Sequence, residues 1–318
     1  MTDPLFDPAP PRRGEPWIDQ PGWYDDISDV DYHLDPVVGG SMSSTGARTL
    51  ATKTPAHYDW DRRHGRPDSK TLDWGKVAHA RVLGRGTEVA VIVGTGKDRN
   101  AWRTDADKAA VAKAKAAGKT PIKYADHQQI EEMARRLRAH PTAGKLLART
   151  GRHEQVGVWQ DQATGVWCRV MADFLPDVPE GARRLVVDYK TTASADPAEF
   201  AKSVANYGYD QQADWYCDGV QALDPRDEPP QFVLIAQEKT PPYGVLVAYL
   251  DELALERGRV RNARARALYR RCTESGEWPG YPVAPVALSL PGWAARTAED
   301  EITAAESGTP DDQEVTPA

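Results

Sequence analysis

Three short apolar stretches that follow one another after residue 150 limit the folds open to this chain. They read EQVGVWQ (154–160), VWCRVMADFLPD (166–177) and LVVDYKT (185–191). Runs of this length rich in β-branched and aromatic residues predict strands, and the turn DQATG joins the first two as a hairpin. The chain therefore needs a sheet in which strands close in sequence are neighbours.

Predicted helices precede and follow these strands. Helices are expected over about 196–222 and 252–273, and two short ones within 41–86, whereas 231–239 and 243–251 predict a second hairpin. The order is helices, three strands, helix, two strands, helix. It predicts an α/β domain with a mixed central sheet flanked by helices and a helical N-terminal part.

The two ends of the chain differ in composition from the rest. The first thirty residues are rich in proline, aspartate and glycine, and the last twenty are polar and acidic without an aromatic residue. Such segments bury too little apolar surface to offset the entropy of ordering. We therefore predict disorder over 1–35 and 296–318, and one folded domain over 36–295.

The net charge of −7 is unevenly distributed. Residues 1–30 carry seven acidic and two basic residues, and 297–318 carry seven acidic and no basic residues, which leaves +5 for 31–296. A mildly basic body permits a polyanionic partner. Arg257, Arg261 and Arg264 share one face of the last predicted helix, and they form either a phosphate-binding stripe or a solvated face.

Three widely spaced cysteines exclude several classes of protein. Cys168, Cys217 and Cys272 cannot make a disulfide scaffold, a four-cysteine zinc site or a four-cysteine iron–sulfur cluster within one chain. A reducing, cytosolic setting is expected. No apolar run approaches the ~20 residues of a membrane helix, so no membrane partner is expected.

The third strand carries a carboxylate and an ammonium on one face. Asp188 and Lys190 are two residues apart, and positions i and i+2 of a strand point the same way. Asp173, near the end of the preceding strand, could add a second carboxylate. Two converging carboxylates suit Mg²⁺ or Mn²⁺, and a neighbouring lysine can orient or help deprotonate the attacking water. This is the chemistry of phosphodiester hydrolysis.

The D-x-K pattern alone is weak, because a surface ion pair produces it as well. The order of the surrounding motifs makes it more specific. Gln212 and Tyr216 form a Q-x-x-x-Y pattern on the following helix, and Tyr209 lies on the same helical face.

Taken together, these segments resemble the RecE-type exodeoxyribonuclease VIII domain, above all its phage-encoded relatives in the PD-(D/E)xK superfamily. The similar segments are SMSSTGARTLATKTPAHY, LDWGKVAHARVLG, CRVMADFLPD, LVVDYKTT, YGYDQQADWYCDG, FVLIAQEKTPPYGVLVAYLDE and EWPGYPVAPVALSLPGW, within about 40–293. The resemblance implies a Mg²⁺-dependent (or Mn²⁺-dependent) exonuclease that degrades linear double-stranded DNA in the 5′→3′ direction. The product would be 3′ single strands for recombination.

The same resemblance implies partners and a location. The partners would be double-stranded DNA ends, a single-strand annealing protein and further copies of the chain in a ring-like homo-oligomer. The location would be the cytoplasm, that of the bacterial host if the protein is phage-encoded. The folded region 36–295 would be the exonuclease domain.

The resemblance also assigns roles to single residues. Asp173 and Asp188 would bind the metal together with His79, which ends a W-G-x-x-x-H stretch, and Lys190 would position the attacking water. A histidine on a helix is otherwise most often a structural residue.

Gln212 and Tyr216 match the motif on the helix that flanks the catalytic site in this family. Without the family, Gln212 would be read as an exposed helix residue and Tyr216 as a core aromatic. Glu154 opens the first strand, where relatives often carry an acidic residue, and whether it belongs to the site stays open.

Two further functions fit the same residues. One is another nuclease of the superfamily, either an endonuclease or a Cas4-like enzyme without the iron–sulfur cluster. The other is a DNA-binding subunit that has lost catalysis, against which the intact D…D-x-K pattern argues.

Overall fold

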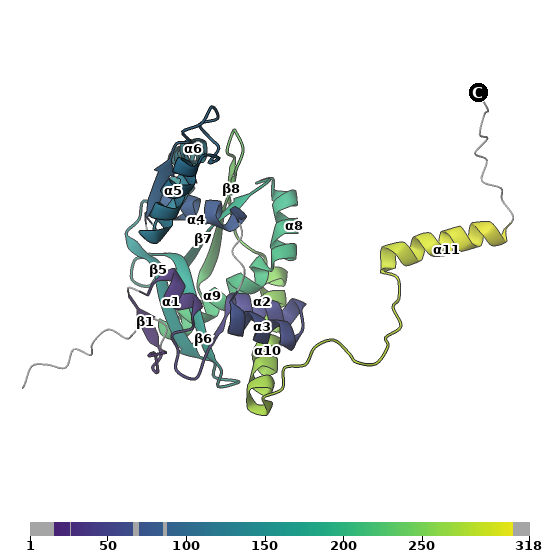
Figure 1. Cartoon of the computed structure of the whole chain (residues 1–318). Coiled ribbons are helices and arrows are strands. Elements are labelled where there is room, and N and C mark those ends of the chain that lie inside the picture. Colours follow the sequence, from purple (N-terminus) through teal and green to yellow (C-terminus); the bar gives the residue numbers. More distant parts are fainter. Residues whose placement is uncertain (1–15, 26, 66–69, 85–87, 308–318) are drawn as a thin grey trace, which may run out of the picture. The chain divides into compact units, whose positions relative to one another are not determined.

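A seven-stranded mixed sheet forms the centre of the fold in the computed structural model (Figure 1), which describes residues 16–25, 27–65, 70–84 and 88–307. The strand order is β1-β5-β6-β7-β8-β9, with β2 paired to β6. Only β7–β8 and β2–β6 are parallel. The strands are β1 (Gly22–Tyr24), β2 (Met42–Ser43), β5 (Gly151–Gln160), β6 (Trp167–Pro176), β7 (Leu185–Thr192), β8 (Gln231–Glu238) and β9 (Val245–Ala248).

Helices cover both faces of this sheet. Their bounds are α1 (Asp29–His33), α2 (Ser44–Thr52), α3 (Pro55–His64), α4 (Lys70–Leu83), α5 (Asp105–Ala116), α6 (Tyr124–Ala139), α7 (Ala143–Leu147), α8 (Pro197–Tyr207), α9 (Tyr209–Leu223) and α10 (Glu252–Ser275). A small parallel pair, β3 (Val89–Ile92) and β4 (Thr120–Lys123), lies between α4 and α6 in the sequence. The predicted fold class is therefore correct, although 41–86 holds three helices rather than two.

Alternation along β7 assigns the helices to their faces. Val186 packs with Phe200 of α8 and Ala213 of α9, whereas Val187 packs with Leu137 of α6 and Ala143 of α7. Successive strand residues point to opposite faces, so even-numbered residues of β7 face α9. Asp188 and Lys190 belong to that set.

The predicted disorder of residues 1–35 is wrong for the part the structure describes. β1 pairs with β5, and Ile18 and Tyr32 are buried with Val37 against Val156 and Val158. A few apolar side chains supply this packing within a segment whose average composition is polar. Residues 1–15 and Asp26 lie outside the described residues.

The chain divides into two units, Met1–Pro279 and Gly280–Ala318. The second unit contains α11 (Gly292–Glu306), in which no residue is buried. The predicted disorder of 296–318 overlaps the end of this helix, where alanine and glutamate favour helical structure, and it stays a prediction. Residues 308–318 lie outside the description. Among the described residues, no helix has both the length and the apolarity needed to cross a bilayer.

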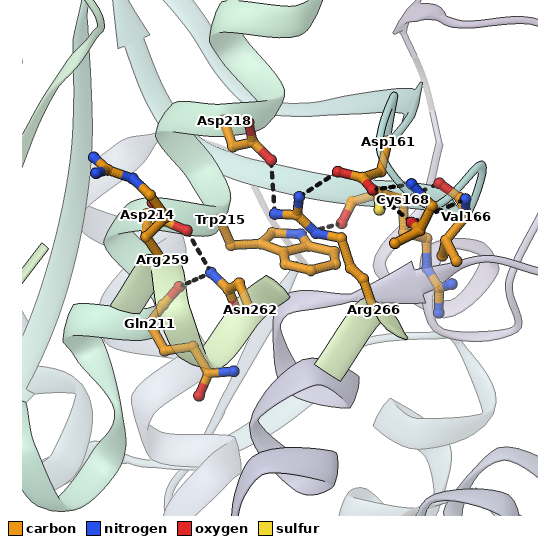
Figure 2. A network of polar contacts seen from close by, with 12 residues as sticks. Asp161, Val166, Cys168, Gln211, Asp214, Trp215, Asp218, Arg259, Asn262 and Arg266 are labelled. Atoms are coloured by element: carbon orange, nitrogen blue, oxygen red, sulfur yellow. Dashed lines mark hydrogen bonds and ion pairs between the residues drawn. The ribbon is translucent and has the colours of Figure 1, made fainter. Parts of the chain in front are cut away.

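A buried polar network fastens α10 to α9 (Figure 2). The Arg266 guanidinium, 8% exposed, lies 2.5 Å from Asp161 Oδ1 and 2.7 Å from Asp218 Oδ2, over the Trp215 ring. Beside it, the Asn262 side-chain amide donates to the backbone carbonyl oxygen of Gln211 and to the carboxylate of Asp214, both in α9. Each charge in this network is paired, as burial requires. Helix α9 is thereby fixed in place over the sheet.

Glycine permits the close approach of these two helices. A Cβ atom at Gly258 of α10 would lie 2.3 Å from the carbonyl oxygen of Asp210 in α9. The obstacle is backbone, which cannot move aside as a side chain can.

We predict that Gly258→Ala lowers the free energy of unfolding by about 1–3 kcal/mol, because it overpacks this contact. Gly75→Ala in α4 is the matched control, since a Cβ there meets nothing within 4 Å. It should be neutral or stabilise by about 0.5–1 kcal/mol. Urea unfolding followed by circular dichroism measures both, and equal stability of the two variants would contradict the packing described.

Candidate active site

Asp188 and Lys190 form an ion pair on β7, in the middle of the sheet. The Asp188 side chain is 0% exposed, and Lys190 Nζ lies 2.6 Å from its Oδ2. Their shared face follows from the strand period, as the sequence predicted. The run LVVDYKTT is apolar around them because β7 is covered on both faces.

Helix α9 completes the surroundings of this pair. Gln212 Nε2 donates to Asp188 Oδ1 at 2.8 Å, and Lys190 Nζ lies 5.2 Å from the centre of the Tyr209 ring. Tyr216 packs edge-on against Phe232. The structure thus brings Gln212 and Tyr209 to the ion pair, while Tyr216 packs against the hydrophobic core beneath α9.

The predicted single helix over 196–222 is in fact two helices. Gly208 separates α8 from α9 with a φ of 66°, a left-handed conformation that glycine adopts without steric cost. The break lets α9 run over the sheet in a direction different from that of α8, which directs Gln212 toward Asp188.

Asp173 lies where β6 and β7 separate. The two strands share one bridge pair, Phe174 with Val187. Beyond this pair, the Asp173 carboxylate replaces a backbone carbonyl as the acceptor of a β7 N–H. Its Oδ2 accepts the N–H of Tyr189 at 3.0 Å and lies 2.7 Å from His79 Nε2. His79 reaches it from α4, so residues nearly a hundred positions apart meet here.

Glu154 lies at the same place. The β5–β6 register on either side sets it opposite Asp173, and its Oε1 is 3.8 Å from His79 Nδ1. Its φ of 49° is unusual for a residue with a side chain and costs about 1–2 kcal/mol. Such strain is concentrated at functional sites. The question that the sequence left open is answered in part, because Glu154 contacts the cluster.

Opposing charges control protonation in this cluster. Burial raises the pKa of Asp188, although Lys190 opposes the rise. Burial would also raise the pKa of Asp173, but His79 and the other donors around it lower that pKa below its usual value. The pKa values of His79 and Lys190 are raised because the carboxylates outweigh the effect of burial.

The donor set fits a hard divalent cation. Asp173 and Asp188 provide carboxylate oxygens, and no hydrogen bond from a described residue reaches Asp173 Oδ1. Asp188 Oδ2 is buried and lies 2.6 Å from the Lys190 ammonium, so a cation bound there would share this oxygen with Lys190. The described residues nevertheless contain no ready-made group of three His, Cys, Asp or Glu ligands. His79 now pairs with Asp173, so its role as a metal ligand stays a prediction.

A comparison with known families identifies the fold. Residues 42–283 match the family described as PDDEXK-like domain of unknown function, DUF3799. The chain belongs to this family. Its central domain therefore has the PDDEXK nuclease fold, which confirms that part of the sequence prediction. The RecE-type assignment within the superfamily stays a prediction.

A solved structure agrees at the level of the fold. A protein from Eubacterium rectale described as a "putative exonuclease" is 15% identical with a TM-score of 0.51, over 81% of this chain and 93% of that chain. The structure of SSO0001 covers 70% of this chain at 12% identity with a TM-score of 0.26, which is too low to support an argument. The search of curated proteins gave no match.

We predict that the His79 ring titrates above its usual pKa of 6.5 in the metal-free protein. The stability that the His79–Asp173 pair adds to the folded state is complete below pH 6.5, the pKa of histidine in the unfolded chain. It is lost as the pH rises through the higher pKa of His79 in the folded protein. Asp173→Asn should lower the His79 pKa, since the larger of the two carboxylate contributions that oppose burial is removed, and Mg²⁺ should lower it in the wild type.

Histidine NMR signals followed against pH give this measurement, with His64 on α3 as the control ring. A His79 titration that does not respond to Asp173→Asn would show that the pair does not form in solution.

Proposed function

We propose that this protein is a divalent-metal-dependent nuclease that hydrolyses phosphodiester bonds in DNA. The observation that carries the proposal is the buried Asp188–Lys190 pair facing α9, with Asp173 on the neighbouring strand. Membership of the PDDEXK-like family supports it. The intact set of charged groups argues against a subunit that has lost catalysis.

A cation held by Asp173 and Asp188 would neutralise phosphate charge and lower the pKa of the attacking water. The chain itself orients both carboxylates: Gln212 holds Asp188 Oδ1, and His79 holds Asp173 Oδ2. Lys190 stays protonated, because Asp188 raises its pKa. It therefore acts as a hydrogen-bond donor to the water or to the phosphate oxygens, where charge builds up in the transition state.

The sequence resemblance supports a finer proposal. The substrate would be linear double-stranded DNA digested 5′→3′ from its ends, which leaves 3′ strands for an annealing protein in recombination. The enzyme would act as a homo-oligomer in the cytoplasm. The described cysteines are free, and Cys168 and Cys272 are buried, so a Cas4-like cluster has no support.

The test of this finer proposal is digestion of end-labelled linear duplex in Mg²⁺ beside a covalently closed circle. An exonuclease should degrade the linear DNA progressively and leave the circle intact. Cleavage of the circle would instead indicate an endonuclease, and cleavage of neither would overturn the proposed function.

We predict that Asp188→Asn removes most of the cleavage rate, because an amide is a poorer ligand for a hard cation. Asn can still accept the hydrogen bond of Gln212, so the fold should persist. Asp227→Asn, at an exposed loop position, is the matched control and should cleave like the wild type. Full activity of Asp188→Asn, or activity in excess EDTA, would contradict the assignment.

We predict that Lys190→Ala slows single-turnover cleavage by roughly 10²–10⁴-fold at saturating enzyme. DNA binding in Ca²⁺ should change little, since one contact among many is lost. Lys190→Arg should not restore the rate, because a planar guanidinium differs in shape from an ammonium. Lys202→Ala, on the exposed side of α8, is the control. A near-normal rate in Lys190→Ala would make this residue a binding group only.

A further inference from the structure

A polar cavity lies beside the candidate active site. Its volume is about 510 Å³, within the range of small-molecule sites. It is formed where α2, α3, the α8–α9 junction and α10 meet. The residues that line it include Arg48, Lys53, Tyr207, Gln211 and Arg261.

The charge of this cavity favours an anion. Three basic residues, Arg48, Lys53 and Arg261, line it together with one acidic residue, Asp61, so positive charge is in excess. Arg48 donates to the carbonyl oxygen of Tyr207 and to Thr45 Oγ1, which hold its guanidinium at the wall. An excess of positive charge attracts phosphate.

An unpaired amide lines the same cavity. Gln211 is 0% exposed, yet neither its Nε2 nor its Oε1 has a hydrogen-bond partner. Figure 2 shows its backbone oxygen bonded to Asn262, while the side chain points away from that contact. Buried polar groups are nearly always paired, so an unpaired amide on a cavity wall indicates a ligand with polar groups of its own.

The cavity and the candidate active site share helix α9. Gln211 lines the cavity, and the next residue, Gln212, binds Asp188. Tyr207, 62% exposed, has its ring 5.8 Å from that of Tyr209, which lies against Lys190. An exposed aromatic ring among cations is the usual platform for a nucleotide of a single strand.

We propose that this cavity binds one nucleotide of the substrate strand next to the nucleotide that is cleaved. Arg48 and Arg261 hold its phosphate, the Tyr207 ring stacks with its base, and Gln211 hydrogen-bonds to it. The assignment rests on the proposed nuclease function for the identity of the strand. It makes the cavity a positioning site that sets which phosphate reaches Lys190.

The test uses the full chain carrying Asp188→Asn, so that DNA is bound without being cut. Binding of a labelled single-stranded oligonucleotide is measured by fluorescence anisotropy over a range of salt concentrations. Arg48→Gln and Arg261→Gln should each weaken binding several-fold and reduce the slope of log K against log salt by roughly 0.7. Arg271→Gln, at an exposed position near the end of the same helix, is the control and should leave the affinity and the salt slope unchanged.

Oligonucleotides with a 5′-phosphate and with a 5′-hydroxyl distinguish the source of the phosphate. Equal loss of binding in both assigns the cavity to a phosphate within the strand, and loss confined to the phosphorylated one assigns it to the strand end. Variants of Arg48 and Arg261 that bind like Arg271→Gln would overturn the proposal.

Gln211→Leu separates ligand binding from structure. Leucine removes the unpaired amide, so the variant should unfold at the same or a higher denaturant concentration while binding the oligonucleotide more weakly. Lower stability with unchanged binding would make Gln211 a structural residue and overturn its role.

The cavity assignment and the nuclease proposal can fail separately. If the wild type cleaves DNA but the cavity variants bind the oligonucleotide as the wild type does, only the cavity assignment fails. If the wild type does not cleave DNA but the cavity variants bind the oligonucleotide more weakly, only the nuclease proposal fails.

Discussion

The burial of the Asp188 carboxylate is the constraint on which the rest of the structure depends. A charge without solvent contact in the middle of a sheet costs several kcal/mol unless other groups compensate it. Lys190 comes from the same strand and Gln212 from α9, while His79 from α4 compensates the neighbouring Asp173. The helices on both faces of the sheet must therefore be in place before this site can form.

The network around Arg266 explains how α9 keeps the position that the site needs. It joins α9, α10 and the turn of the β5–β6 hairpin through paired charges (Figure 2). Gly258 lets the two helices approach closely. Helix α9 then presents Gln212 to Asp188 and Gln211 to the neighbouring cavity. One well-anchored helix thus connects the candidate catalytic groups with the proposed nucleotide site.

Much of this site could be predicted because strand periodicity is local. Asp188 and Lys190 are two residues apart, so any strand through them places both on one face. Glu154 was harder to place, because its position opposite Asp173 depends on the β5–β6 register, which the hydrophobic pattern and the turn set together. The start of α9 after Gly208 depends on packing against distant parts of the chain. The packing of Ile18 and Tyr32 also depends on distant contacts, and the polar average composition of residues 1–35 had indicated disorder instead.

Asp173 and Asp188 together should bind a divalent cation. Crystals of the protein soaked in Mn²⁺, with diffraction recorded at the manganese absorption edge, test this without any assay of activity. One or more anomalous peaks are expected within coordination distance of both carboxylates, and they should be absent in crystals of Asp188→Asn. Peaks found only elsewhere on the chain, or peaks unaffected by the substitution, would contradict it.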